Sequence, residues 1–160
     1  MHMYLKLFLP CLLGSLFLLA ACKQQDQKLI GKVEAEIATR QSEFGHYESV
    51  GASLEKLQRE LEASFPSLED APADSLKMKA NAMVTKEKSA LAEYKDGLVS
   101  LTRRLADYRA GTVDQKALEL EYAVASKSLG NMKKTFTTLE NQDLYLREEY
   151  AQRLKKQTAK

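Results

Sequence analysis

Apolar residues recur at alternating steps of three and four along most of this chain, which is the spacing of helices that bury one narrow face. The first stripe contains Ile30, Val33, Ile37, Phe44, Tyr47, Leu54 and Leu61, with Leu57 beside it. The second stripe contains Ala80, Val84, Leu91, Tyr94, Leu98, Leu101, Leu105 and Tyr108. The third contains Leu118, Tyr122, Ala125, Leu129, Met132, Phe136, Leu139, Leu146 and Tyr150. The pattern predicts long helices over about residues 28–65, 75–110 and 113–156.

A proline marks the end of the first predicted helix. Pro66 cannot continue the backbone hydrogen bonds, and the residue before a proline avoids helical angles. Residues 66–74 have the sequence PSLEDAPAD and are predicted to form an acidic connection. Asp74 or Ser75 is a suitable N-cap for the second helix, because a side-chain oxygen there accepts a hydrogen bond from a free backbone amide.

The second and third predicted helices are separated by a few residues only. Gly111 fits a C-terminal cap, and Thr112 to Gln115 has the form of a capping box. Stop and start signals this close predict a tight hairpin between antiparallel helices. Single narrow apolar stripes suit a long bundle better than a compact globule. The predicted fold of residues 28–156 is therefore all-α: an elongated three-helix antiparallel (up-down-up) bundle with coiled-coil-like packing.

Five residues interrupt the stripes where a core side chain is expected, namely Arg40, Gly51, Gln58, Glu87 and Asp143. Counting the rise along each helix brings Gln58 and Asp143 to nearly the same level, so we expect them to share a polar core layer. Such layers set helix register more often than they perform chemistry. Gly45, Gly97 and Gly130 also fall at similar heights, and they either form a waist or are unrelated glycines that the helices tolerate.

The N-terminal part of the chain departs from this pattern. Residues 1–6 are weakly basic, and residues 7–21 form an uncharged run dominated by leucine and phenylalanine. This run is shorter than the about 20 residues of a membrane-spanning helix and ends in the small residues Ala20 and Ala21. We therefore expect residues 1–21 to be a secretory signal peptide that is removed.

The junction Leu19-Ala20-Ala21-Cys22 resembles the lipobox of bacterial lipoproteins. The resemblance implies that the Cys22 thiol carries diacylglycerol, that the bond before Cys22 is cut and that the new amine is acylated. Two or three acyl chains anchor a protein stably, whereas one anchors it only reversibly. Residues 22–27 are then expected to form a short tether to the bundle. The alternative is an ordinary signal peptide with an incidental cysteine.

The cysteines, the net charge and the residue after Cys22 indicate which partners and which membrane the protein is expected to have. Cys11 lies in the leader, so its removal leaves Cys22 alone and no intramolecular disulfide can form. The formal net charge of +2 falls by one when Lys6 is removed with the leader, so we expect no nucleic-acid partner. Lys23 replaces the aspartate that commonly retains lipoproteins at the inner membrane. By analogy the outer membrane is favoured for a source with two membranes, and the outer face of the plasma membrane for a source with one.

Side chains that perform most catalysis are scarce after Cys22. His46 is the only histidine there, and no nucleophile elbow, phosphate loop or Cys-x-x-Cys motif occurs. Glu43 and His46 have the Glu-x-x-His spacing of di-iron helix bundles, but those sites need the motif on two helices. We therefore predict no enzyme activity, no catalytic residue, no metal site and no cofactor apart from the diacylglycerol and acyl chain on Cys22.

The end of the chain is basic, with Lys155 and Lys156 followed by a tail over residues 157–160 that includes Lys160. Cations at a helix C-terminus complement the backbone dipole, so one interpretation is purely structural. In an up-down-up rod anchored at Cys22 the third helix ends far from the membrane, which makes these lysines candidates for a distal contact. The small outer-membrane lipoprotein joined to peptidoglycan through a C-terminal lysine offers a parallel for Lys160, although the neighbouring residues differ.

Two functions follow as hypotheses. The first is a cell-envelope lipoprotein that acts as a membrane-anchored structural or adaptor rod and binds another envelope protein or the cell wall. The second is a lipid-anchored binding module, in which the methionine-containing second and third helices open around an apolar ligand or a client segment. A homodimer is a further candidate, because Leu57 widens one edge of the first stripe.

Overall fold

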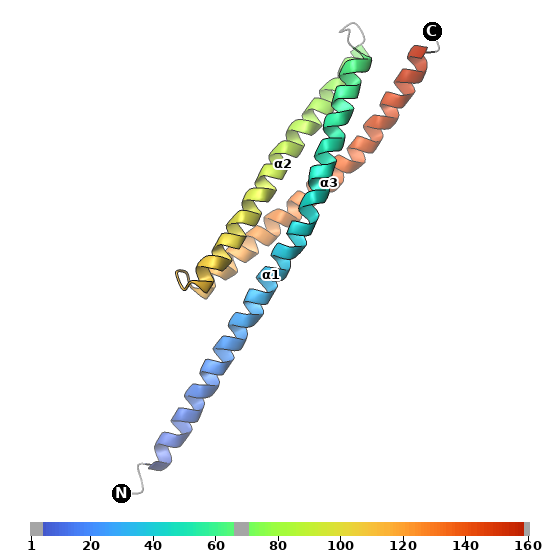
Figure 1. Ribbon diagram of the computed structural model, residues 1–160. Helices are drawn as coiled ribbons and strands as arrows, with labels where there is room; N and C mark the ends of the chain where they lie inside the picture. The colour runs from blue at the N-terminus through green and yellow to red at the C-terminus, as the bar shows by residue number, and fades with distance from the viewer. Residues whose placement is uncertain (1–4, 66–70, 159–160) are drawn as a thin grey trace.

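The protein is an all-α, up-down-up bundle of three long helices, as the stripes predict. The structure is a computed structural model that describes the backbone of residues 5–65 and 71–158 and the side chains of residues 26–65 and 72–157. Its helices are α1 (Leu5–Ser64), α2 (Ala71–Arg109) and α3 (Gln115–Thr158). Figure 1 shows α2 running back along α1 and α3 returning beside both, with the N-terminal part of α1 extending beyond the bundle.

The first helix begins much earlier than the predicted boundary at residue 28. It runs without interruption from Leu5 to Ser64, so the predicted tether over residues 22–27 is helical in the chain with its leader attached. Residues 23–27 are rich in lysine and glutamine, which favour helix, and no proline or glycine separates them from Leu29. Within the described ranges, no helix is long and apolar enough to cross a membrane.

The second helix begins at Ala71, earlier than the predicted Asp74 or Ser75. Pro72 lies in its first turn, where a missing amide proton costs nothing because no intrahelical partner exists there. Asp74 is therefore a first-turn residue, where its charge complements the helix dipole and pairs with Lys77 at 3.2 Å. Residues 66–70 of the predicted connection lie outside the described residues.

The turn between α2 and α3 confirms Gly111 as a C-terminal cap and corrects the predicted capping box. Gly111 has a φ of 72°, its amide donates to the Tyr108 carbonyl at 3.0 Å, and the Thr112 amide donates to Asp107 at 3.0 Å. These bonds form a Schellman motif. The Thr112 hydroxyl also closes α2 by donating to the Asp107 carbonyl at 2.9 Å. The N-cap of α3 is instead Asp114, whose carboxylate accepts from the Ala117 amide at 2.8 Å.

The apolar stripes form the core that joins the three helices. Its centre is an aromatic layer with one ring from each helix, in which Tyr47 stacks on Phe136 at 4.0 Å and meets the edge of Tyr94 at 5.1 Å. Leu57 is fully buried in this core, so it does not supply the spare surface on which the homodimer hypothesis was based. Of the three glycines expected at one height, only Gly97 lies close to another helix, with Leu129 at 3.3 Å from a Cβ placed there.

Candidate functional site

An ionic junction beside the aromatic layer links all three helices. Glu43 on α1 accepts hydrogen bonds from Lys133 of α3 at 2.6 Å, from Tyr94 of α2 at 3.1 Å and from Arg40 at 3.0 Å. Burial opposes ionisation of Glu43, but these donors outweigh it and lower the pKa of the carboxyl. The sequence marked Arg40 as an interruption of the stripe, and the structure shows that its guanidinium serves this junction.

His46 does not join Glu43 in a metal site. The imidazole is half exposed and its Nε2 pairs with Oε1 of Glu140 on α3 at 2.8 Å, whereas Glu43 is taken up by the junction. Among the described residues no group of three or more His, Cys, Asp or Glu side chains is placed to hold a metal ion. His46 is therefore an edge residue that connects α1 to α3.

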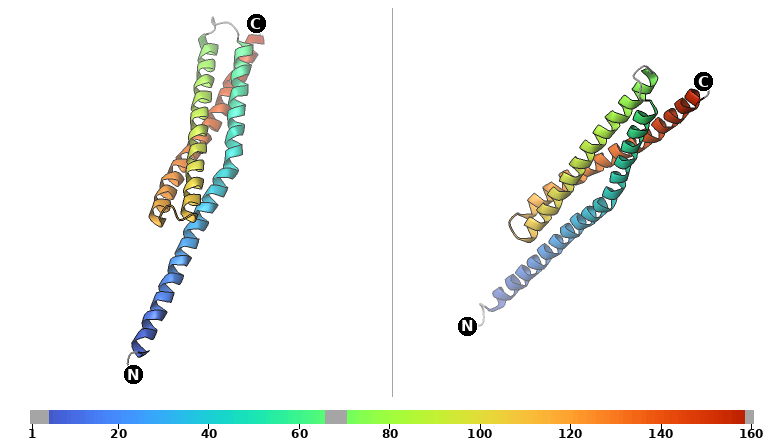
Figure 2. Two further views of the ribbon diagram at one scale, coloured as in Figure 1. Left: turned by 60° about the vertical axis from the view of Figure 1, so that its left-hand side comes forward. Right: turned by 45° about the horizontal axis from the view of Figure 1, so that its top comes forward.

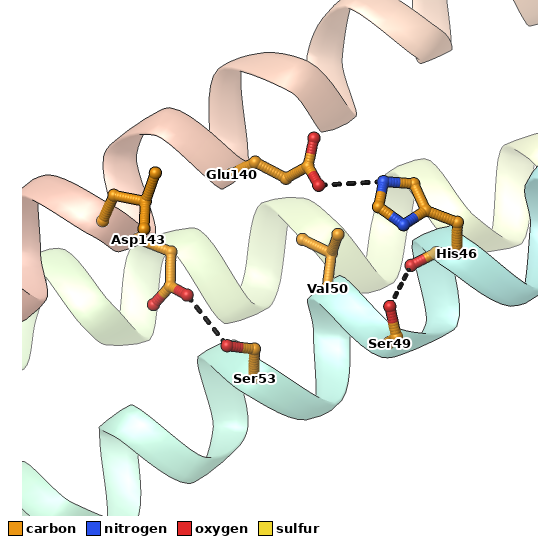
Figure 3. A pocket seen from close by; sticks show the side chains of 7 residues that line it. His46, Ser49, Val50, Ser53, Glu140 and Asp143 are labelled. Carbon is orange, nitrogen blue, oxygen red and sulfur yellow. Dashed lines mark hydrogen bonds and ion pairs between the residues drawn. The ribbon is translucent and has the colours of Figure 1, made fainter.

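A small pocket of about 250 Å³ opens between α1 and α3 next to this pair (Figure 3). Its lining includes two serines, which are the candidate nucleophiles. Ser49 donates to the backbone carbonyl of His46 at 2.6 Å, and Ser53 donates to Oδ2 of Asp143 at 2.8 Å. Neither of these bonds goes to the imidazole, and the Ser53 hydroxyl is held by the buried Asp143 carboxylate. Its polar groups instead fix the position of α3 against α1.

The polar core layer predicted at Asp143 exists, but its partner on α1 is Ser53. Asp143 is 8 % exposed and also accepts from Nε of Arg147 at 3.1 Å, while Nη2 of Arg147 donates to the Ser53 carbonyl at 2.7 Å. Gln58 donates to Glu62 within its own helix at 3.2 Å. Ser53 precedes Gln58 by five residues, so the predicted register was displaced by about 7.5 Å.

Arg147 is expected to stabilise this layer measurably. Replacing it with methionine leaves the buried Asp143 without its cation, so Arg147→Met should lower the free energy of unfolding by about 1–2 kcal/mol in urea denaturation. The exposed Arg103, replaced in the same way, is the control. Equal stability of the two variants would show that the layer contributes nothing.

A second buried carboxyl lies between α1 and α2. Glu87 is 2 % exposed, and its Oε1 has no hydrogen-bond partner among the described residues. The carboxyl occupies the notch left by Gly51, where an added Cβ would lie 2.5 Å from Oε1. Burial, with a smaller contribution from nearby Glu55, raises the pKa of Glu87. Both residues interrupted the predicted stripes, but sequence alone did not show that they face each other.

The α2–α3 turn is fastened to the part of α1 that follows Cys22. The Tyr108 hydroxyl donates to Asp26 at 2.5 Å, and this bond, together with burial, raises the pKa of Tyr108 to about 12. Arg109 forms an ion pair with Glu34. The backbone of Cys22 belongs to α1, one turn before Asp26, and its side chain lies outside the described residues.

The basic C-terminal residues lie at the opposite end of the bundle, as Figures 1 and 2 show. Lys155 and Lys156 are in the last turn of α3, where they complement the helix dipole. Lys160, the third residue predicted for a distal contact, lies outside the described residues.

Comparisons of the chain with known protein families, curated proteins and solved structures found no match.

Proposed function

We propose that the protein is a cell-envelope lipoprotein whose helical rod acts as a structural adaptor between a membrane and another envelope component. The observation that carries this proposal is Leu19-Ala20-Ala21-Cys22 at the end of a short apolar run. Such a run is too short to span a bilayer, and its small residues before a cysteine resemble a lipoprotein processing site. Lipid on Cys22 would supply the anchor.

The arrangement of the helices supports this role. Tyr108 in the last turn of α2 is bonded to Asp26, so this end of the bundle lies near the proposed anchor, while the C-terminal lysines lie at the far end. With 39 residues, α2 is about 58 Å long, which makes the bundle a spacer of that order. Outer-membrane residence in a source with two membranes is part of the proposal, because Lys23 does not match the usual inner-membrane retention signal.

Replacing Cys22 with serine tests the anchor. In the native host the wild-type chain should begin at residue 22, carry diacylglycerol and an acyl chain by mass spectrometry, and sediment with membranes. Cys22→Ser should lose the lipid, retain the leader and leave the lipoprotein fraction. Cys11→Ser in the leader is the matched control and should be processed normally. A wild-type chain with an unmodified thiol would contradict the proposal.

A further inference from the structure

A long groove runs between α2 and α3 on the side away from α1. One hollow of about 660 Å³ lies between Met83 of α2 and Tyr145 of α3, and a second of about 570 Å³ adjoins it. The two share Ala82 and Lys86 in their lining, so they form one continuous depression. Its length along two helices suits an extended occupant better than a compact small molecule.

The side chains along the groove repeat with coiled-coil spacing. The α2 wall contains Lys79, Ala82, Lys86, Ser89 and Glu93, at alternating steps of three and four. Facing them, Thr135, Thr138, Gln142 and Tyr145 follow the same rule on α3. This second seam is separate from the apolar stripes that hold the bundle together. A seam on two neighbouring helices is the arrangement that receives the side chains of one further helix.

The size and exposure of the side chains that line the groove indicate which side chains a bound helix would place in it. The walls are lined by small side chains such as Ala82, Ser89 and Thr138, which leave space between the helices. The floor is apolar, because Met83 and Leu146 line it, and Tyr145 adds a ring that is 62 % exposed. Bulky apolar side chains on the incoming helix would fill this space and bury the floor.

The lysines that line the groove indicate which charge the bound helix carries beside its apolar face. Lys86 lies along the middle of the groove and has no ion pair or hydrogen bond to a described residue. Lys79 pairs with Glu149 at 3.1 Å but is half exposed. A second copy docked face to face about a two-fold axis at the middle of the groove would bring Lys86 against its own counterpart, which is repulsive. Acidic side chains fit the flanks instead.

We propose that the groove between α2 and α3 binds one amphipathic helix of a partner protein, with bulky apolar residues facing Met83 and acidic residues facing Lys79 and Lys86. This inference deepens the proposed adaptor function, on which it rests, by naming the contact surface and the class of partner. The incoming helix completes a four-helix arrangement over the distal half of the rod.

The test uses two designed helical peptides with the same leucine-rich face, one flanked by glutamates and the other by lysines. Binding to the full-length lipidated protein in detergent is followed by fluorescence anisotropy. The glutamate peptide should bind about tenfold or more tightly than the lysine peptide. The variant Lys79→Glu/Lys86→Glu should reverse that preference. Lys95→Glu/Lys116→Glu makes the same charge change at exposed positions outside the groove and should preserve it.

Several results would overturn the inference. They are equal binding of the two peptides, equal loss in the groove and control variants, or self-association through the groove detected by sedimentation. Ala82→Trp, which fills the groove from an exposed position, should abolish binding while the helical circular dichroism is unchanged. The two proposals fail separately. A wild-type chain with an unmodified Cys22 thiol that still binds the glutamate peptide refutes the anchor alone, whereas a lipidated wild-type chain that does not bind the peptide refutes the groove alone.

Discussion

Replacing Phe136 with alanine is expected to lower the free energy of unfolding by about 3–5 kcal/mol. The side chain is fully buried, stacks on Tyr47 with 7° between the rings and meets Tyr94 edge-on at 6.3 Å. Its removal therefore opens a cavity where all three helices meet and also removes aromatic contacts. Since small domains are stable by only about 5–15 kcal/mol, this single change consumes a large share of the total.

Urea denaturation followed by circular dichroism measures the loss, and both proteins should show the same slope of the free energy against urea if the substitution changes stability alone. Leu144→Ala is the control, because Leu144 lies on the same helix but is 63 % exposed. Its cost should be within about 0.5 kcal/mol. A loss below about 1 kcal/mol for Phe136→Ala would mean that the aromatic layer is not the packed centre of the bundle.

A second substitution is expected to stabilise the protein instead of destabilising it. Replacing Glu87 with methionine is expected to raise the free energy of unfolding at pH 7 by about 1–4 kcal/mol. The carboxyl is buried beside Gly51 and forms no ion pair with a described residue. Methionine has a similar length, no charge and the flexibility to fill the same notch. The nearest charged groups on α1 and α2 are Glu55 and Lys88, which pair with each other at 2.9 Å.

The effect must depend on pH. Burial raises the pKa of Glu87 in the folded chain above its usual 4.5, so the folded state binds a proton more tightly than the unfolded state. The stability that this proton contributes is complete below pH 4.5 and is lost as the pH rises through the folded value. The advantage of Glu87→Met should therefore be largest at pH 7 and should shrink toward pH 4. Glu43 has the reverse sign, but it is present in both proteins.

Glu48→Met controls for the general effect of removing a surface charge, since Glu48 is exposed on α1. Thermal and urea unfolding between pH 4 and pH 7 give the comparison. If the difference between wild type and Glu87→Met were the same at both ends of this range, the carboxyl would not be the titrating group that destabilises the bundle.

Local features of the fold could be predicted because they are written in short stretches of sequence. The spacing of three and four fixed which face of each helix is buried, as the burial of Leu54, Leu101 and Leu129 confirms. Gly111 was recognisable as a cap because the left-handed backbone there favours glycine. The start of α2 was predicted too late from the N-cap candidates Asp74 and Ser75, because proline is also tolerated in the first turn of a helix, where Pro72 lies.

Contacts between helices were harder to predict. The level of one helix against another depends on both connections, so small errors in each moved the partner of Asp143 from Ser53 to Gln58. The Glu87–Gly51 contact was missed for the same reason. The groove was not predicted, because its walls are small and polar and, of Met83 and Leu146 on its floor, only Leu146 belongs to a predicted stripe. The prediction that Cys22 carries lipid, in contrast, is based on the sequence alone.

The odd number of helices has a mechanical consequence. Because α1 and α3 run in the same direction, the start of α1 and the end of α3 lie at opposite ends of the molecule (Figure 1). A pull between those ends is directed along the helix axes, and it slides α3 past α1 instead of peeling them apart. The cross-links from Glu43 to Lys133, Ser53 to Asp143 and Ser64 to Tyr150 then resist together. A pull of this kind would therefore load these three cross-links together.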